Sequence, residues 1–172
     1  EPMDSSRKMK FFKKLVDVGY KEIEVGFPAA SDTDFNFIRE LINDGHIPDD
    51  VTIQVLTQSR EELIIKTIDS LKGSKNAIIH LYNSTSTLQR KVVFKEDMNG
   101  VKKIATDGAK IISDNIGILN NTNVRLEYSP ESFTGTELPY ALEVCEEVLD
   151  VWEANELKPV IINLPATVEM SS

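Results

Sequence analysis

The chain has 172 residues, of which 41% are hydrophobic and 27% charged, and its formal net charge is −9 at pH 7. This size and composition predict one folded domain with a packed core and exclude a disordered chain. The negative charge argues against a sequence-independent nucleic-acid surface, because phosphate binding depends on Lys and Arg. The single cysteine, Cys145, excludes an internal disulfide framework and indicates a reducing compartment. No run approaches the ~18 apolar residues of a membrane span, so we expect no membrane partner.

Runs rich in β-branched and aliphatic residues alternate with segments of helical periodicity. Glycines are placed to end several of the helices. In chain order, the first predicted elements are a helix through Phe12, Leu15 and Val16 ending at Gly19, a strand at 21–27, a helix through Phe35, Ile38 and Leu41 ending at Gly45, and a strand at 51–56. A helix through Ile64, Ile68 and Leu71 ending near Gly73 and a strand at 76–82 follow. The last predicted elements are a helix at 97–114, a strand at 123–128, a helix through Ala141, Val144, Cys145, Val148 and Trp152, and a strand at 158–164.

Two motifs predict where helices begin. Ser59 with Glu62, and Thr134 with Glu137, both have the spacing of a capping box. In that motif a hydroxyl and a carboxylate each satisfy a free backbone amide in the first turn of the helix.

The alternation of strands and helices predicts parallel strands joined by right-handed crossovers. An open doubly wound sheet and a (β/α)8 barrel share this pattern. The glycine fingerprint G-x-G-x-x-G and the P-loop, which would favour the doubly wound sheet, are absent from the sequence. We therefore expect an α/β fold, specifically part of a (β/α)8 TIM barrel with about five parallel strands, the second to the sixth of eight.

Polar, chemically useful residues follow each predicted strand. The strand ends read GFPAASDTD, LTQSREE, HLYNSTS, YSPESFTGTE and NLPATVE. The carboxyl ends of parallel strands lie at one edge of a sheet, and in a barrel they surround a common centre. We expect His80, in HLYNSTS, to be one of several side chains that face such a centre.

These phrases, together with GYKEIEVGFPAASDTDF and DDVTIQVLTQSREELI, closely resemble the 2-isopropylmalate synthase family in order and spacing, from about Lys10 to the last residue. Related enzymes include homocitrate synthase, citramalate synthase and hydroxymethylglutaryl-CoA lyase. The resemblance implies that residues 1–172 are an incomplete TIM-barrel catalytic domain, without its first and later strands and without a second domain. It also implies a longer parent enzyme, which we expect to be a cytoplasmic homodimer, or mitochondrial if the parent is eukaryotic.

The reaction implied by the resemblance is a Claisen-type condensation in leucine biosynthesis. Acetyl-CoA loses a methyl proton, and the enolate attacks the keto carbon of 3-methyl-2-oxobutanoate; thioester hydrolysis then gives 2-isopropylmalate and CoA. Such chemistry needs a Lewis acid on the keto oxygen and a base for the methyl proton. Two alternatives remain open: a homocitrate or citramalate synthase, and a truncated interaction chain without catalysis.

The family uses a divalent metal, Mg, Mn or Zn, bound by an Asp of the first strand and a His-x-His pair on a later strand. Neither motif occurs in this chain, whose two histidines are His46 and His80. We therefore expect no native metal site and no turnover from these 172 residues alone.

The resemblance also implies roles for individual residues in the oxo-acid pocket. It assigns catalytic roles to His80 and Glu131, although neither is assigned as the base. It assigns the apolar contact to the branched side chain to Leu56, and the contact to the ligand carboxylate to Thr167. The remaining substrate-binding residues that it implies are Tyr82, Ser129, Asn163 and Pro165.

Several of these residues also have a purely structural interpretation. From spacing alone His80 is a core histidine, and Glu131 is equally well a residue that caps the next turn. Glu22 and Glu24 alternate with Ile23 and Val25, which is typical of a strand with one polar face. Alternatively, Glu24 lies behind the arginine that the family carries on its first strand.

Three further segments are expected to be structural only. Residues 84–87 are predicted to form a solvated turn, and His46 is predicted to be a loop residue without a role. Cys145 lies on the apolar stripe of its helix, which favours core packing over a nucleophile.

Overall fold

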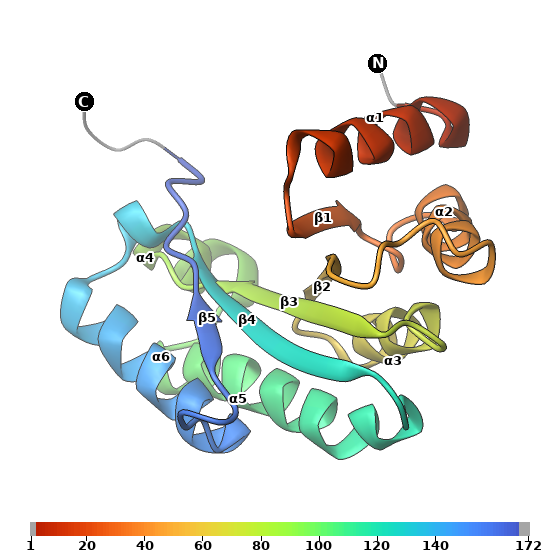
Figure 1. The fold of residues 1–172 in the computed structure, drawn as a ribbon. Helices are drawn as coiled ribbons and strands as arrows, with labels where there is room; N and C mark the ends of the chain where they lie inside the picture. The colour runs from red at the N-terminus through yellow and green to blue at the C-terminus, as the bar shows by residue number, and fades with distance from the viewer. Residues whose placement is uncertain (1–2, 169–172) are drawn as a thin grey trace.

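Five parallel strands form one sheet in which every strand lies beside its neighbours in sequence (Figure 1). The computed structural model describes residues 3–168. The motif NLPATVEM therefore ends, at Glu169 and Met170, outside the described residues. The strands are β1 (Glu22–Gly26), β2 (Thr52–Gln58), β3 (Asn76–Ser84), β4 (Asn123–Glu131) and β5 (Val160–Ile162).

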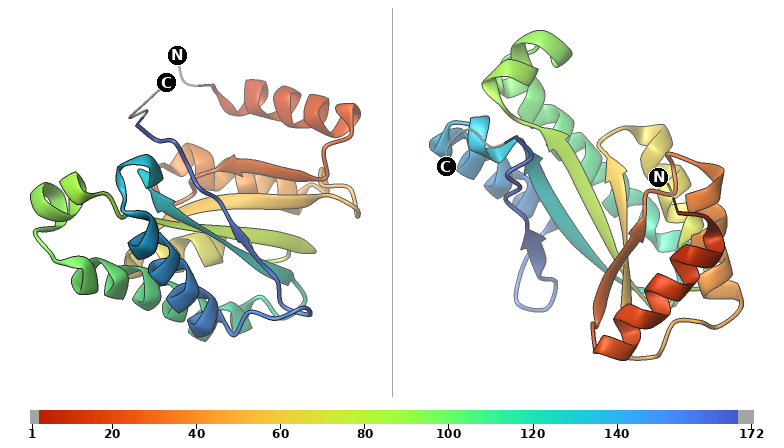
Figure 2. Two further views of the ribbon diagram at one scale, coloured as in Figure 1. Left: turned by 90° about the vertical axis from the view of Figure 1, so that its left-hand side faces the viewer. Right: turned by 90° about the horizontal axis from the view of Figure 1, so that it is seen from above.

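Helices cover the outer face of the sheet, and the strands fan out along an arc (Figure 2, right). Helices α2, α3, α5 and α6 connect or follow the strands, and α1 packs beside α2 and β1. The long helices are α1 (Ser5–Val18), α2 (Asp32–Asn43), α3 (Glu61–Ser70), α5 (Met98–Asn115) and α6 (Leu138–Trp152). The short ones are α4 (Thr87–Gln89), a π-helical turn (Arg90–Phe94) and two 3₁₀ turns (Ile116–Ile118 and Phe133–Gly135).

The strand order β1-β2-β3-β4-β5 distinguishes the two architectures that the sequence left open. A doubly wound sheet reverses its strand order at a switch point, whereas a barrel adds each strand to the same edge. Arg125 of β4 forms an ion pair with Glu22 of β1 across two intervening strands, which fits a sheet that curves toward its inner face. The prediction of an α/β partial (β/α)8 barrel is confirmed.

The two faces of the sheet differ in polarity. In β2, Ile53, Val55 and Thr57 are buried beneath the helices, whereas the alternating residues Gln54 and Leu56 are half-buried on the inner side. Such alternation follows from the pleat of a strand. The apolar core therefore lies between sheet and helices, and the inner face is left to polar side chains. Within residues 3–168, no helix combines the length and apolar character that crossing a membrane requires.

The predicted helix ends are only partly correct. Gly19 has φ 106° and caps α1, as predicted, because only glycine adopts such a conformation without strain. Both predicted capping boxes are wrong. Ser59 Oγ donates instead to the Ile104 carbonyl oxygen at 2.5 Å, and Thr134 Oγ1 donates to the Val168 carbonyl oxygen at 2.6 Å. In both cases a tertiary acceptor takes the hydroxyl that local spacing assigned to the helix.

The prediction of a solvated turn at 84–87 is also wrong for its first three residues. Strand β3 continues to Ser84, and Ser84, Thr85 and Ser86 are buried. Buried Arg90 explains why: its guanidinium donates to the Thr85 carbonyl oxygen at 2.9 Å and to both carboxylate oxygens of Glu137 at 2.7 and 2.8 Å. This charge-assisted contact closes the loop over the polar residues.

The close approach of α5 to the β2–α3 loop requires glycine at position 108. A Cβ added there would overlap Ser59 Oγ and would lie 3.2 Å from Leu81 Cδ1. Overpacking of this kind costs about 1–3 kcal/mol. We expect Gly108→Ala to lower the free energy of unfolding by that amount in urea denaturation.

The matched control for this prediction is Gly117→Ala. A Cβ at Gly117 meets no atom within 4 Å, and that glycine does not have a positive φ. Equal unfolding free energies for the two variants would contradict the packing account.

Candidate functional site

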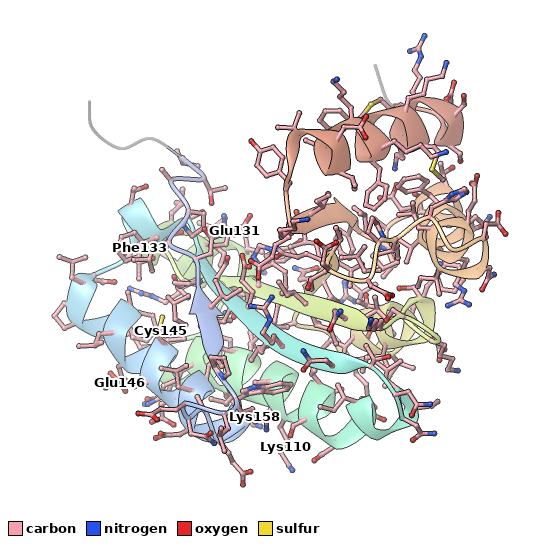
Figure 3. The ribbon with its side chains drawn as sticks, viewed as in Figure 1. Lys110, Glu131, Phe133, Cys145, Glu146 and Lys158 are labelled. Carbon is pink, nitrogen blue, oxygen red and sulfur yellow. The ribbon has the colours of Figure 1, made fainter. Side chains whose placement is uncertain are left out.

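A pocket of about 210 Å³ opens at the carboxyl ends of the strands. Side chains of β2, β3 and β4 and of the segment after β5 converge on it. In Figure 3, Glu131 lies at the end of β4, whereas Cys145 lies away from it on α6. The pocket is lined by Leu56, His80, Tyr82, Ser129, Glu131, Asn163, Pro165 and Thr167. All eight site residues that the resemblance implied are therefore found together, while their roles remain predictions.

The register of the sheet explains this convergence. Leu56 pairs with His80, and Tyr82 pairs with Ser129, so each strand contributes its inward-facing residues at the same height. Asn163 follows β5 directly, and its backbone N–H donates to the Tyr128 carbonyl oxygen at 3.0 Å. The pocket is therefore a direct product of parallel pairing and inward alternation.

His80 is the centre of a hydrogen-bonded chain that spans four strands, β1 to β4. Its Nδ1 lies 2.7 Å from Glu24 Oε2, and its Nε2 lies 2.7 Å from Ser129 Oγ. The Gln54 amide donates to Glu24 Oε2 at 2.8 Å, and the Asn163 amide donates to Ser129 Oγ at 2.7 Å. Only 9% of His80 is exposed, so these contacts replace water around the imidazole.

Two carboxylates flank the imidazole and have opposite pKa shifts. Burial raises the pKa of Glu24, but hydrogen bonds from His80 and Gln54 outweigh it and hold the pKa below its usual value. Burial raises the pKa of Glu127 above its usual value, and the negative charge of Glu24 acts in the same direction. Glu127 Oε1 is 3.4 Å from His80 Nε2. Glu24 is therefore the charged partner of the imidazole, and Glu127 holds its proton more readily.

The rim of the pocket carries an acid and two hydroxyls. Burial raises the pKa of Glu131, and burial together with the charge of Glu131 raises the pKa of Tyr82. The Tyr82 ring meets the Phe27 ring edge-on, with centroids 6.3 Å apart. Thr167 Oγ1 accepts a hydrogen bond from the Ser132 backbone N–H at 3.1 Å, so its own proton is free to face a ligand.

Sequence reasoning missed Gln54 and Glu127, and it interpreted Glu24 either as part of the polar face of its strand or as a neighbour of the family's first-strand arginine. Each of these residues lies on the inner face of its strand: Gln54 is two residues before Leu56, and Glu127 is two before Ser129. A period of two, counted back from the predicted pocket residues, would have identified both.

The pocket does not provide a complete metal site. Among residues 3–168, the group of three potential ligands that comes close enough is Glu40, Asp44 and His46. These residues surround the carboxyl end of α2, at the opposite edge of the sheet from the pocket. Three donors do not converge on a point beside His80, so the described residues do not fit the divalent metal that the family resemblance implies.

The structure bears on two other residues outside the pocket. Cys145 is buried, and burial raises the pKa of its thiol to about 11, so it is a protonated core residue and not a nucleophile at neutral pH. His46 lies in the loop after α2, as predicted.

Comparison with known proteins agrees with this architecture. The HMGL-like family model matches residues 1–172. The chain is 65% identical over 173 residues to the 2-isopropylmalate synthase of Parafrankia sp. (strain EAN1pec). The matched segment covers 100% of the chain and 31% of the relative. It is 61% identical to the 2-isopropylmalate synthase of Renibacterium salmoninarum, over 99% of the chain and 29% of the relative.

A more distant relative gives the same result. The 2-isopropylmalate synthase of Clostridium acetobutylicum is 56% identical over 100% of the chain and 31% of the relative. The chain thus spans about three tenths of the length of the curated relatives that it matches. The family match extends over the whole chain, and the chain belongs to the HMGL-like family.

Proposed function

We propose that this chain provides the 2-oxo-acid pocket of a 2-isopropylmalate synthase. The observation that carries the proposal is the single pocket lined by Leu56, His80, Ser129, Glu131 and Thr167 together with the other three predicted residues. Relatives with that name, 55–65% identical to the chain, support the choice of 3-methyl-2-oxobutanoate as the ligand. Its class, a small acid with one branched apolar end, matches the mixed lining of the pocket.

The two ends of such a ligand call for different side chains. Leu56 and Pro165 provide the apolar wall for the isopropyl group. The hydroxyls of Tyr82 and Thr167 are donors for the carboxylate, and both are protonated at neutral pH. His80 and Glu131 are left to orient and polarise the keto group, which is where negative charge develops in the reaction.

The reaction that this pocket would serve joins two carbon atoms. A base removes a methyl proton from acetyl-CoA, the enolate carbon bonds to the keto carbon, and the keto oxygen becomes a hydroxyl after taking up a proton. Water then cleaves the thioester to give 2-isopropylmalate and CoA. Because the group of potential metal ligands found among residues 3–168 lies away from the pocket, we assign the divalent metal to segments outside these residues and derive no step through it.

The five-stranded sheet of residues 3–168 is part of a barrel and is not closed. In the described part of the chain, β1 and β5 each pair on one side only, and a barrel closes only when its outermost strands also pair. We infer that further strands complete the domain in a longer parent enzyme, and that the isolated chain does not turn over acetyl-CoA. We further infer a homodimeric parent that acts in the cytoplasm, as the family resemblance implies.

Leu56 is expected to set the preference for a branched ligand. We expect the chain to bind 3-methyl-2-oxobutanoate more tightly than pyruvate in calorimetric titration, because a small apolar group in such a pocket is worth about 1–3 kcal/mol. Leu56→Ala should reduce the ratio of the two affinities about tenfold, which corresponds to the lower limit of that range.

The control is Leu157→Ala, since Leu157 is 97% exposed. It should leave both affinities unchanged. Binding of pyruvate as tight as that of the branched acid would contradict the proposed substrate, and an equal effect of both leucine variants would contradict the role of Leu56.

The affinity for the oxo-acid anion should depend on pH through Glu131. Burial raises the pKa of this carboxyl, so it is neutral over a wider pH range than an exposed glutamate. As pH rises through that pKa, the carboxylate that forms repels the ligand anion, so the affinity should fall. The fall should be up to about tenfold for each unit by which the pKa of Glu131 is higher in the complex than in the free protein.

Glu131→Gln should remove much of this pH dependence in the same titration. Glu62→Gln removes the same charge from an exposed side chain on α3 and should leave the dependence in place. Affinity that rises with pH, or a Glu131→Gln profile identical to that of the unmodified protein, would contradict the assignment.

A further inference from the structure

The hydrogen-bonded chain through His80 constrains where each of its protons lies. Glu24 Oε2 is 2.7 Å from His80 Nδ1, and two unprotonated atoms do not approach so closely. Hydrogen bonds hold Glu24 as a carboxylate despite its burial. The same oxygen also accepts from the Gln54 amide at 2.8 Å. The shared proton of the Glu24–His80 contact therefore belongs to Nδ1.

The other side of the imidazole is constrained by Asn163. The Asn163 amide donates to Ser129 Oγ at 2.7 Å, so one lone pair of the hydroxyl oxygen is already used. The hydroxyl keeps one proton and one lone pair, and Nε2 lies 2.7 Å from Ser129 Oγ, so Nε2 either accepts that proton or, in an imidazolium, donates to that lone pair. A neutral imidazole with its proton on Nδ1 offers a lone pair at Nε2, which accepts the Ser129 proton.

We propose that Glu24 is a positioning residue that holds His80 as the neutral Nδ1–H tautomer and that, together with Asn163, it directs the Ser129 proton away from the pocket. The chain of donors then runs in one direction, from Asn163 through Ser129 and His80 to Glu24. Glu127 Oε1, at 3.4 Å from Nε2, is too distant to replace Ser129 as the partner of that nitrogen.

This assignment deepens the proposed function, on which its consequence for the ligand rests. Ser129 offers only its remaining lone pair to the pocket, so it repels a ligand carboxylate and accepts from a ligand hydroxyl. The carboxylate of an oxo acid is therefore directed toward Tyr82 and Thr167, whose protons are free. Orientation of the ligand thus depends on Glu24, a residue that does not line the pocket.

The tautomer is measured directly by ¹⁵N NMR of the labelled protein without ligand. The chain has two histidines, so the ring nitrogens can be assigned with a His46→Gln variant. At neutral pH we expect His80 to show a protonated Nδ1 and an unprotonated Nε2. A protonated Nε2, an imidazolium with two protonated nitrogens, or the averaged signals of a solvent-exposed histidine would each overturn the proposal.

Three variants distinguish a role of Glu24 in setting the His80 tautomer from a general role in packing. In Glu24→Ala the Gln54 amide, 3.2 Å from Nδ1, becomes the nearest donor to that nitrogen, so the imidazole should change to the Nε2–H tautomer. Gln54→Leu keeps the Glu24 carboxylate and should retain Nδ1–H. Glu22 lies on the same strand as Glu24, and its carboxylate pairs with Arg125. Glu22→Ala removes that carboxylate and should also retain Nδ1–H.

A Glu24→Ala variant that retains the Nδ1–H signal overturns the role of Glu24, and loss of that signal in Glu22→Ala overturns its specificity. These signals are recorded without ligand. A failure of the protein to bind oxo acids would contradict the proposed function and leave the tautomer result standing, so the two proposals fail separately.

Discussion

The register of the parallel sheet is the constraint on which the site depends. Because side chains alternate between faces, Leu56, His80 and Ser129 reach the inner face only if β2, β3 and β4 pair as they do. A slip of one residue would turn His80 into the helix-covered core and expose Ile79 on the inner side. The apolar residues that hold the helices on the sheet therefore also fix the position of the pocket.

The inner face combines this geometry with a high density of charge. His80 and Glu127 are almost buried, and Glu24 and Gln54 complete their surroundings. Buried ionisable groups are costly unless each is hydrogen-bonded, so a stable fold requires the partners to be present together. The contacts from His80 to both Glu24 and Ser129 satisfy this requirement and at the same time orient the imidazole toward the pocket.

Much of the fold follows from the sequence, because its signals are repeated along the chain. Five β-branched runs, each followed by polar residues, predict parallel strands with their useful ends at one edge, and β1 to β5 agree with this. The eight site residues were identified through a family resemblance and not through periodicity. Local spacing failed at Ser59 and Thr134, where tertiary carbonyls compete for the hydroxyls. It failed at Ser84 to Ser86 because Arg90, several residues away, closes the loop.

The central proposal is that one pocket at the strand ends binds a small branched 2-oxo acid. Its most direct test is a set of intermolecular NOEs between the methyl groups of 3-methyl-2-oxobutanoate and the side-chain protons of the labelled protein. We predict contacts to Leu56 and to Pro165, with none to the exposed Leu157. A bound ligand whose methyl groups contact another part of the chain, or the absence of binding at concentrations that saturate such pockets, would contradict the account.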